Sequence, residues 1–304
     1  MITSFSNKYV REVVQLNQKA KARNKQDLFV VEGSKMFQEA PESRIERVYI
    51  ARRAEQELRG LYGKKLDKVF CEVVVDDVFD KMSDTKTPQG ILTLVKQYHY
   101  QIEELLMRKQ ARKCIDKNTG KSISIIGGER NKNLLYIILE DIQDPGNLGT
   151  IFRTGEAVGV DGIIMSSHTV DIYNPKTIRS TMGSVYRVPF VYTEDICRTI
   201  RMLQRNDVRV YAADLGSSKF YDECDYYGNT AFLIGNEGNG LREETAACAD
   251  EPVGIPMEGS VESLNAAIAS TVLFYEAYRQ RRSGLTIAAR KERQTGWQKK
   301  RKEL

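Results

Sequence analysis

The sequence predicts an α/β protein with two domains, the second built on a mostly parallel sheet. Short apolar runs of strand type alternate with helical stretches along the chain, which is typical of this class. A length of 304 residues fits about two domains, and a hydrophobic share of 41% suffices for a sizeable core. We predict domains at residues 1–96 and 133–280, a polar linker or insertion at 97–132, and a tail at 281–304.

The first domain is predicted from alternating helical and extended stretches. A helical period with a basic outer face runs from Lys8 to Arg23. Strands are expected at Phe29–Val31, Arg47–Ile50, Lys68–Val73 and Gly90–Val95. These elements indicate a compact α/β domain that ends near Val95.

The second domain is predicted from strand signals that recur after residue 133. They fall at 134–139, 162–165, 188–192, 208–213, 231–235 and 253–256, and helical stretches separate several of them. One helix is expected to begin at Asn147, as its N-cap, and to stop at Gly159. The final helix is expected from Ser260 to Arg279. A stripe on it, Leu264, Ile268, Thr271/Val272 and Tyr275, fits either core packing or a dimer face.

The net charge of +5 is distributed unevenly. Residues 281–304 hold nine Lys or Arg and two Glu, a net of +7, so the rest of the chain carries about −2. A basic tail on a near-neutral body indicates a polyanionic partner, nucleic acid first. A solvated tail without a partner gives the same composition.

Composition also argues against several classes of protein. No stretch approaches the ~20 apolar residues of a membrane span, and the N-terminus lacks the apolar core of a signal peptide. Five scattered cysteines without a C-x-x-C pair favour reduced thiols and a cytoplasmic location. Only two histidines, His99 and His168, argue against a zinc site or a Ser-His-Asp triad, and we expect no metal.

The most informative segment is residues 134–159, where a strand-like run ends in acid, proline and glycine and a helix follows. In open α/β sheets, ligands bind beyond the carboxyl end of such a strand. Arg153 lies about two turns into the helix among small and apolar residues. An arginine there needs an anion or a partner carboxylate, although a surface arginine on an amphipathic helix gives the same pattern.

Two further loops follow predicted strands: GNEGNGL at 235–241 and IPMEGSVESLN at 255–265. Glycines let backbone approach a ligand closely, and free N–H groups there can bind an adenine edge or a carboxylate. The glycine spacing G-x-x-G-x-G differs from that of dinucleotide sites, and the Gly120-Lys121-Ser122 segment lacks the earlier glycine of a phosphate-binding loop. The two loops therefore predict a nucleotide-like pocket of another kind.

These residues carry a resemblance. N-x-G-x-x-x-R-T at 147–154, G-N-E-G-x-G-L at 235–241 and I-P-M-x-G-x-x-x-S-L-N at 255–265 resemble the three motifs of the SpoU (TrmH) family, RNA ribose 2′-O-methyltransferases of the SPOUT superfamily. The match covers residues 133 to about 280. The N-terminal part, with F-V-V-E-G at 29–33 and T-P-Q-G at 87–90, is similar to the family's RNA substrate-binding domain, an α/β fold like a ribosomal protein.

The resemblance implies S-adenosylmethionine as methyl donor, a homodimer, and a deep trefoil knot in a SPOUT α/β domain, a rare exception to unthreaded topology. It implies cofactor contacts at Gly235, Asn236, Gly238, Ile255, Met257, Leu264 and Asn265. It also implies catalytic residues, which are Arg153 and Asn147 in the loop of the first motif and Glu237, Ser263 and Asn265 in the second and third motifs. The implied substrate is RNA, ribosomal RNA first and transfer RNA second.

The residues leave the proton acceptor open. A guanidinium with a pKa above ~12 is a poor base, so Arg153 is more natural as a hydrogen-bond donor to the alkoxide and the adjacent phosphate. The proton then leaves to the RNA phosphate, to water or to Glu237, which also fits a carboxylate that ties loop N–H groups. The alternative function is a non-catalytic RNA-binding or ribosome-assembly protein on the same scaffold.

Overall fold

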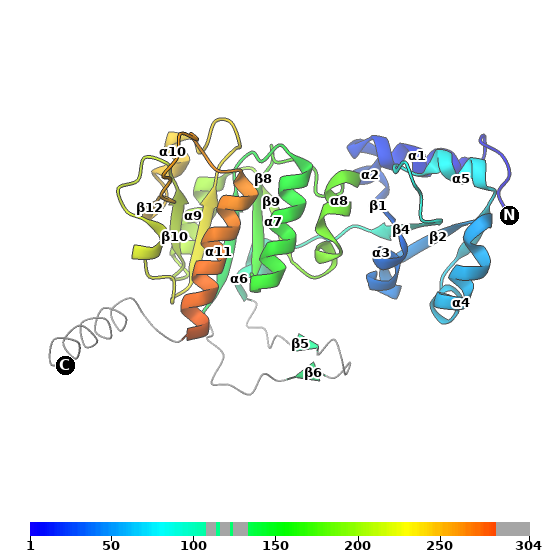
Figure 1. Ribbon diagram of the computed structural model, residues 1–304, viewed down its shortest axis with the longest axis horizontal. Helices are drawn as coiled ribbons and strands as arrows, with labels where there is room; N and C mark the ends of the chain where they lie inside the picture. Colours follow the sequence, from blue (N-terminus) through cyan, green and yellow to red (C-terminus); the bar gives the residue numbers. More distant parts are fainter. Residues whose placement is uncertain (108–113, 116–121, 124–132, 284–304) are drawn as a thin grey trace. The chain divides into compact units, whose positions relative to one another are not determined.

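The computed structural model describes residues 1–107, 114–115, 122–123 and 133–283. They belong to two compact units (Figure 1). The first unit comprises residues 1–99, 141–157 and 168–189, and the second comprises 100–140, 158–167 and 190–304. Because residues 141–157 and 168–189 group with the N-terminal part, the units do not follow the predicted domain boundaries at 96 and 132, which stay predictions.

Four strands of the first unit form a mixed sheet in the order β1-β4-β2-β3. The strands are β1 (Leu28–Glu32), β2 (Ile45–Ala51), β3 (Cys71–Val74) and β4 (Ile91–Lys96). Strand β4 is antiparallel to β1 and β2, whereas β2 and β3 are parallel. The four predicted strands are confirmed, except that the third begins at Cys71 rather than Lys68.

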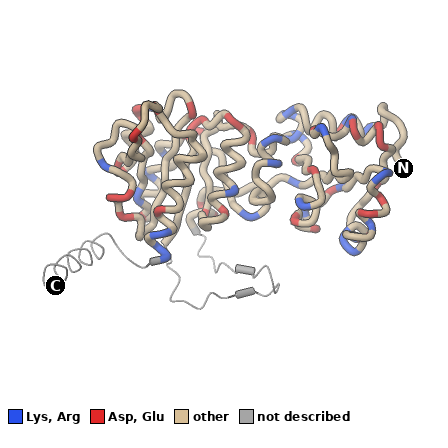
Figure 2. Tube along the Cα trace, in the orientation of Figure 1, with Lys and Arg blue, Asp and Glu red and all other residues tan. Residues whose placement is uncertain are grey.

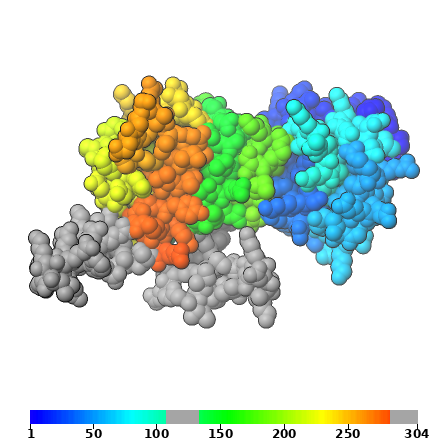
Figure 3. Space-filling model, viewed as in Figure 1, coloured from blue at the N-terminus to red at the C-terminus, as the bar shows by residue number. Residues whose placement is uncertain are grey.

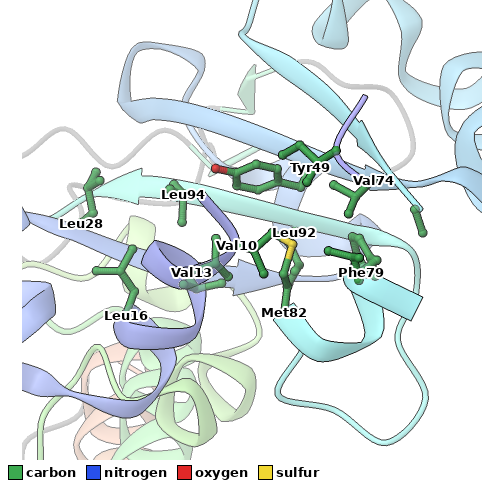
Figure 4. Close-up of a cluster of buried hydrophobic side chains, with 14 residues drawn as sticks. Val10, Val13, Leu16, Leu28, Tyr49, Val74, Phe79, Met82, Leu92 and Leu94 are labelled. Carbon is green, nitrogen blue, oxygen red and sulfur yellow. The ribbon is translucent and has the colours of Figure 1, made fainter. Parts of the chain in front are cut away.

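Helices and short turns complete this unit. The helices are α1 (Lys8–Gln18), α2 (Ala20–Gln26), α3 (Ser34–Glu39), α4 (Glu55–Leu66), α5 (Asp76–Met82), α7 (Pro145–Val158, with its last residue in the second unit) and α8 (Pro175–Thr181). The 3₁₀ turns are η1 (Glu42–Arg44), η2 (Arg52–Ala54) and η3 (Ser184–Tyr186). Helices α1 and α5 bury one face of the sheet, where Val13 of α1, Phe79 of α5 and Leu92 of β4 belong to one cluster of buried side chains (Figure 4).

The single helix predicted from Lys8 to Arg23 is wrong, because the segment folds as α1 and α2. The chain is extended at Lys19 (φ −128°, ψ 115°). The break turns Arg23, only 3% exposed, so that it donates to the Leu16 carbonyl at 2.6 Å and to the Asp171 carboxylate at 2.6 Å. A buried cation needs such acceptors, and a hydrophobic period does not reveal them.

Six strands of the second unit form a parallel sheet in the order β12-β10-β11-β7-β8-β9. They are β7 (Leu135–Leu139), β8 (Gly162–Ser166), β9 (Phe190–Thr193), β10 (Arg209–Ala213), β11 (Thr230–Ile234) and β12 (Glu251–Val253). The traces of β7, β8 and β11 carry no charged residue (Figure 2), as expected of strands buried on both faces. The mostly parallel sheet is confirmed, but the last strand ends at Val253 instead of extending to Pro256.

The two faces of the β11 strand contact different helices. Ala231 and Leu233 belong to a cluster with Ile200 of α9 (Ile196–Gln204), whereas the Phe232 ring lies 6.0 Å from the ring of Phe274 on α11 (Ala266–Ser283). The unit also contains α6 (Ile102–Met107), α10 (Glu243–Ala246), η4 (Tyr221–Glu223) and a short antiparallel pair, β5 (Cys114–Ile115) with β6 (Ser122–Ile123). No helix in the described ranges is long and apolar enough to cross a membrane.

The predicted linker at 97–132 includes an ordered helix. Leu105 of α6 is fully buried, and the Tyr136 hydroxyl donates to its carbonyl at 2.9 Å. Within this segment, residues 108–113, 116–121 and 124–132 lie outside the described residues. So does the predicted tail after residue 283.

The predicted tail begins too early, because α11 continues to Ser283 and Arg281 is part of the fold. The Arg281 guanidinium donates to the carbonyls of Tyr226, Gly228 and Leu134 at 3.0, 2.6 and 2.9 Å. The sequence analysis included the charge of Arg281 in the basic tail, but this side chain binds backbone carbonyls at one end of the sheet.

Candidate functional site

A pocket of about 150 Å³ in the second unit collects residues from four segments. They follow strands β10, β11 and β12, which are neighbours in the sheet, and the first turns of α11 complete the wall. Carboxyl ends of parallel strands share one edge, which is where α/β sheets bind ligands. The lining residues are Ala213, Asp214, Leu215, Ile234, Gly235, Asn236, Glu237, Gly238, Gly240, Val253, Ile255, Met257, Ser263, Leu264, Ala266 and Ala269.

The loop after β11 folds back on itself. Asn236 and Gly240 exchange backbone hydrogen bonds of 3.0 Å, and the Asn236 Oδ1 accepts the N–H groups of Gly238 and Asn239 at 2.9 and 3.0 Å. The Asn236 side chain therefore ties loop N–H groups, a role that the sequence suggested for Glu237. Glu237 itself is half-buried and lines the pocket.

Gly235 has no room for a side chain. An added Cβ would lie 2.3 Å from the Gly240 carbonyl carbon and 2.4 Å from the Leu241 nitrogen. The sequence argument expected a close approach between this glycine and a ligand. In the structure the atoms that occupy the space belong to the loop's own backbone.

The segment after β12 reaches the pocket without forming a helix or a strand. Ile255, Met257, Ser263 and Leu264 line the pocket. The predicted helix start at Ser260 is therefore wrong, and α11 begins at Ala266. The physical reason is a cap at Asn265, whose Oδ1 accepts the N–H groups of Ala267 and Ile268 at 3.0 and 3.3 Å.

Asn265 is consequently placed as the helix cap and is absent from the pocket lining. Its predicted cofactor contact and catalytic role stay predictions, as do those of the other sites. The remaining predicted cofactor positions, together with Glu237 and Ser263, lie around one cavity.

Sequence reasoning missed the segment after β10. Ala213, Asp214 and Leu215 line the pocket, and Leu215 is 67% exposed although apolar. The signal was present, because this strand also ends at the same edge of the sheet. No glycine-rich pattern marked the loop, so it drew no attention.

The first unit holds the other two predicted catalytic residues, both on α7. This helix begins at Pro145, so Asn147 is inside its first turn and is not the N-cap. Asp144 performs the capping: its Oδ1 accepts the Asn147 N–H at 2.8 Å. This bond, with help from Lys176, lowers the pKa of Asp144 below its usual range. Proline suits the first helical position because its missing N–H is unpaired there anyway.

Arg153 is exposed on α7, and among the described residues no carboxylate pairs with its guanidinium. Arg187 of the same unit is different, since it binds both Glu156 and Glu39. Among the described residues, Arg153 therefore forms no internal ion pair. A surface cation and a group that binds a substrate anion both remain consistent with its exposure.

The motif glycine Gly149 has a packing role. An added Cβ would lie 2.3 Å from the Cβ of Ser180, so this glycine allows α7 to approach α8 closely. The approach explains the glycine of the N-x-G motif without a ligand.

The pocket suits a ligand with an aromatic base and several polar groups. Ile255, Leu264 and Ala269 supply apolar wall, whereas the loop from Gly235 to Gly240 supplies backbone polar groups and the Asn236 amide. Small-molecule sites combine such walls with a few placed polar groups. The lining residues thus fit the adenosine portion of S-adenosylmethionine. Among the described residues no cluster of metal-ligating side chains occurs.

Comparison with protein families identifies both parts of the chain. Residues 134–275 match the SpoU rRNA Methylase family, and residues 7–93 match the MRM3-like substrate binding domain. Among characterised relatives, the 23S rRNA (guanosine(2553)-2′-O)-methyltransferase RlmP of Bacillus subtilis is 28% identical over 90% of this chain and 97% of its own length. The 23S rRNA (uridine(2479)-2′-O)-methyltransferase of Streptomyces viridochromogenes is 35% identical over 51% of this chain and 56% of its own.

Solved structures agree in fold. The AdoMet-bound rRNA methyltransferase from Sinorhizobium meliloti is 29% identical, covers 92% of this chain and 97% of its own, and superposes with a TM-score of 0.72. The SpoU methyltransferase AviRb from Streptomyces viridochromogenes, 24% identical, shares the fold with a TM-score of 0.73 over 91% of this chain and 99% of its own. The SPOUT-type fold with an N-terminal substrate-binding domain is thereby confirmed, whereas the knot stays a prediction. The chain therefore contains a domain of the SpoU rRNA methylase family at residues 134–275, preceded by an MRM3-like substrate binding domain at residues 7–93.

Proposed function

We propose that this protein transfers a methyl group from S-adenosylmethionine to a ribose 2′-hydroxyl of ribosomal RNA. One observation carries the proposal: two separate loops, 235–240 and 255–264, line a single pocket at the carboxyl edge of a parallel sheet. The 23S rRNA activity named for the Bacillus subtilis relative and the AdoMet-bound Sinorhizobium meliloti structure support it. Transfer RNA is the second candidate substrate.

The cofactor is held by the pocket residues Gly235, Asn236, Gly238, Ile255, Met257 and Leu264, with Asn265 beside them at the helix cap. Bound S-adenosylmethionine supplies a methyl group on a sulfonium, which is already a good electrophile. The protein's task is then to align the ribose hydroxyl with that methyl group, and alignment alone accounts for several kcal/mol of a barrier.

Arg153 acts as a donor to the developing alkoxide and to the neighbouring phosphate. The absence of a described carboxylate partner supports this role, because a guanidinium already held by an anion would be neutralised. A group with a pKa above ~12 does not accept the ribose proton at neutral pH. Asn147 and Ser263 are proposed to orient the substrate, and Glu237, the RNA phosphate and water remain the candidate proton acceptors.

A binding and a transfer experiment test the proposal together. Isothermal calorimetry with S-adenosylmethionine should give one site per chain. Transfer of tritiated methyl to in vitro transcribed 23S rRNA should produce a dinucleotide that resists alkaline hydrolysis, since a methylated 2′-oxygen cannot attack the adjacent phosphate. Absence of cofactor binding would contradict the enzyme and favour the non-catalytic RNA-binding function. Binding without transfer to ribosomal RNA, but with transfer to transfer RNA, would move the substrate to the second candidate.

The protein is further proposed to be a homodimer. Along α11 an apolar stripe is open to solvent: Ile268, Tyr275 and Tyr278 are 52%, 48% and 39% exposed. The helix lies at the surface in Figure 3. Ile268 and Tyr275 are too exposed for core packing, which supports the other alternative for this stripe, an interface with a second copy. Sedimentation equilibrium should give a dimer that Tyr275→Glu weakens.

The cytoplasmic location expected from the cysteines also belongs to the proposal. Four cysteines, Cys71, Cys197, Cys224 and Cys248, are free thiols, which fits a reducing compartment.

A further inference from the structure

Glu140 is a buried carboxylate that the proposed mechanism does not use. It follows the last residue of β7 and is 1% exposed. The backbone N–H of Glu140 donates to the carbonyl of Ile234 at 2.9 Å, which extends the pairing of β7 with β11 by one bond. Glu140 is absent from the pocket lining.

The carboxylate of Glu140 faces donors on the chain just after residues 235–241, which are called the cofactor loop below. It accepts the backbone N–H of Arg242 at 2.9 Å, the Arg242 Nε at 2.8 Å and the Thr245 hydroxyl at 2.6 Å. A second guanidinium nitrogen of Arg242 lies 2.6 Å from it. A carboxylate out of water needs this number of donors, and such charge-assisted bonds are about twice as strong as neutral ones.

Glu140 therefore bonds to both ends of the cofactor loop, 235–241. Ile234 directly precedes the loop and Arg242 directly follows it, and one residue contacts both. Within the loop, the pair between Asn236 and Gly240 forms a smaller closed turn. Gly235 lies under the backbone of Gly240 and Leu241, so the path of the chain at Arg242 determines whether the loop covers Gly235 correctly.

We propose that Glu140 is a positioning residue, which fixes both ends of loop 235–241 and so shapes the pocket for S-adenosylmethionine. The proposal rests on the proposed function, because it assumes that this pocket is the cofactor site. It also explains why a carboxylate stands at this position. Three of the groups that face it are N–H donors, so an amide would turn its own NH₂ toward at least one of them.

Glu140→Gln is the diagnostic variant because it keeps the shape and removes only the charge and one acceptor. Calorimetry should give a Kd for S-adenosylmethionine at least 10-fold above that of the wild type. The bonds of Glu140 to Ile234, Arg242 and Thr245 are called the clamp below. The Kd for RNA and the kcat at saturating cofactor should change by less than 3-fold, since the clamp acts on the pocket and not on the reacting atoms. Thr245→Val, which removes one donor to the same carboxylate, should weaken cofactor binding in the same direction and by less.

Glu276→Gln is the matched control. Glu276 is also buried, 8% exposed, and bonds to Arg279 and to Gln280 on α11, apart from the loop and the pocket lining. It should lower the melting temperature without changing the cofactor Kd. Equal weakening of cofactor binding by both variants would reduce Glu140 to a general stabilising role, and an unchanged cofactor Kd in Glu140→Gln would overturn the proposal.

Hydrogen exchange separates this inference from the proposed function. Amides of residues 235–242 should exchange faster in Glu140→Gln than in the wild type and in Glu276→Gln, with no ligand present. If the wild type binds no S-adenosylmethionine, the proposed function fails, but faster exchange confined to the loop still supports the clamp. Unchanged exchange in the loop overturns the clamp whatever the ligand.

Discussion

Replacing Gly235 with alanine tests whether the turn of the cofactor loop over this glycine forms the pocket. The new Cβ would lie 2.3 Å from the Gly240 carbonyl carbon, 2.4 Å from the Leu241 nitrogen and 2.5 Å from the Gly240 oxygen. Carbon contacts normally lie at about 3.5–4.0 Å, so the backbone of the loop must retreat by about 1 Å. Backbone atoms cannot rotate away as the end of a side chain can.

The expected size of the effect follows from that clash. Overpacking of this kind costs about 1–3 kcal/mol. If the loop must return to its wild-type position to bind the cofactor, this cost weakens the binding constant by roughly 5- to 150-fold. Calorimetry with S-adenosylmethionine should thus show a weakening in this range. Thermal unfolding should shift by only a few degrees, because the loop lies at the edge of the sheet.

Two other glycines of the same unit make the result interpretable. An added Cβ at Gly228 meets nothing within 4 Å, so Gly228→Ala controls for the loss of a glycine as such. At Gly238 the nearest atom, the Asn236 Oδ1, is at an ordinary 3.6 Å, so any effect of Gly238→Ala on cofactor binding reports the ligand's own proximity. Wild-type affinity in Gly235→Ala would refute the assignment of this loop to the cofactor.

Three further changes address the remaining parts of the proposal. Arg153→Ala should reduce methyl transfer at least ~100-fold, the scale of one lost transition-state donor, with the cofactor Kd nearly unchanged. Arg198→Ala, on the exposed face of α9, is the control. Activity of Arg153→Ala within a few-fold of the wild type would exclude the proposed role of Arg153. Asp144→Ala should cost about 1 kcal/mol of unfolding free energy in urea at pH 7, as for other lost caps. The native bond to the Asn147 N–H lowers the pKa of Asp144. The cap therefore contributes fully to the free energy of unfolding above about pH 4, and this contribution is lost as the pH falls through the lowered pKa. The difference in unfolding free energy between Asp144→Ala and the wild type should accordingly shrink at pH 3. A persistent difference there would refute the cap. Truncation after Ser283 removes seven Lys or Arg and two Glu. It should flatten the salt dependence of RNA binding, by up to ~0.7 in log–log slope per lost phosphate contact on single strands, and leave cofactor affinity and melting temperature unchanged. A lowered melting temperature with the same salt slope would mean that the tail folds onto the protein.

The sequence alone determined most of the sheet and the members of the pocket. Runs such as 135–139 and 230–234 are apolar without alternation because both faces of a parallel strand are buried, so they can be recognised one at a time. The motif loops could be assigned to one site because parallel strands present their carboxyl ends at one edge. These inferences need only local composition and one general rule of topology.

The tertiary structure decided the features that depend on partners distant in sequence. The helix predicted to reach Arg23 is interrupted because Arg23 is buried against Asp171, 148 residues away. Arg281 belongs to the folded domain and not to the tail because it binds carbonyls beside β7 and β11. Helix α11 starts late because residues up to Leu264 are drawn into the pocket wall and Asn265 supplies the cap.

Glu140 shows the same limit most clearly. In the sequence it is one acid after an apolar run, and nothing local distinguishes it from Asp141 beside it. Its donors stand at positions 242 and 245, and only the pairing of β7 with β11 brings them to its carboxylate. A hydrophobic period or a motif records which surface a residue faces, whereas the partner of a buried charge is fixed by contacts that form when the sheet assembles.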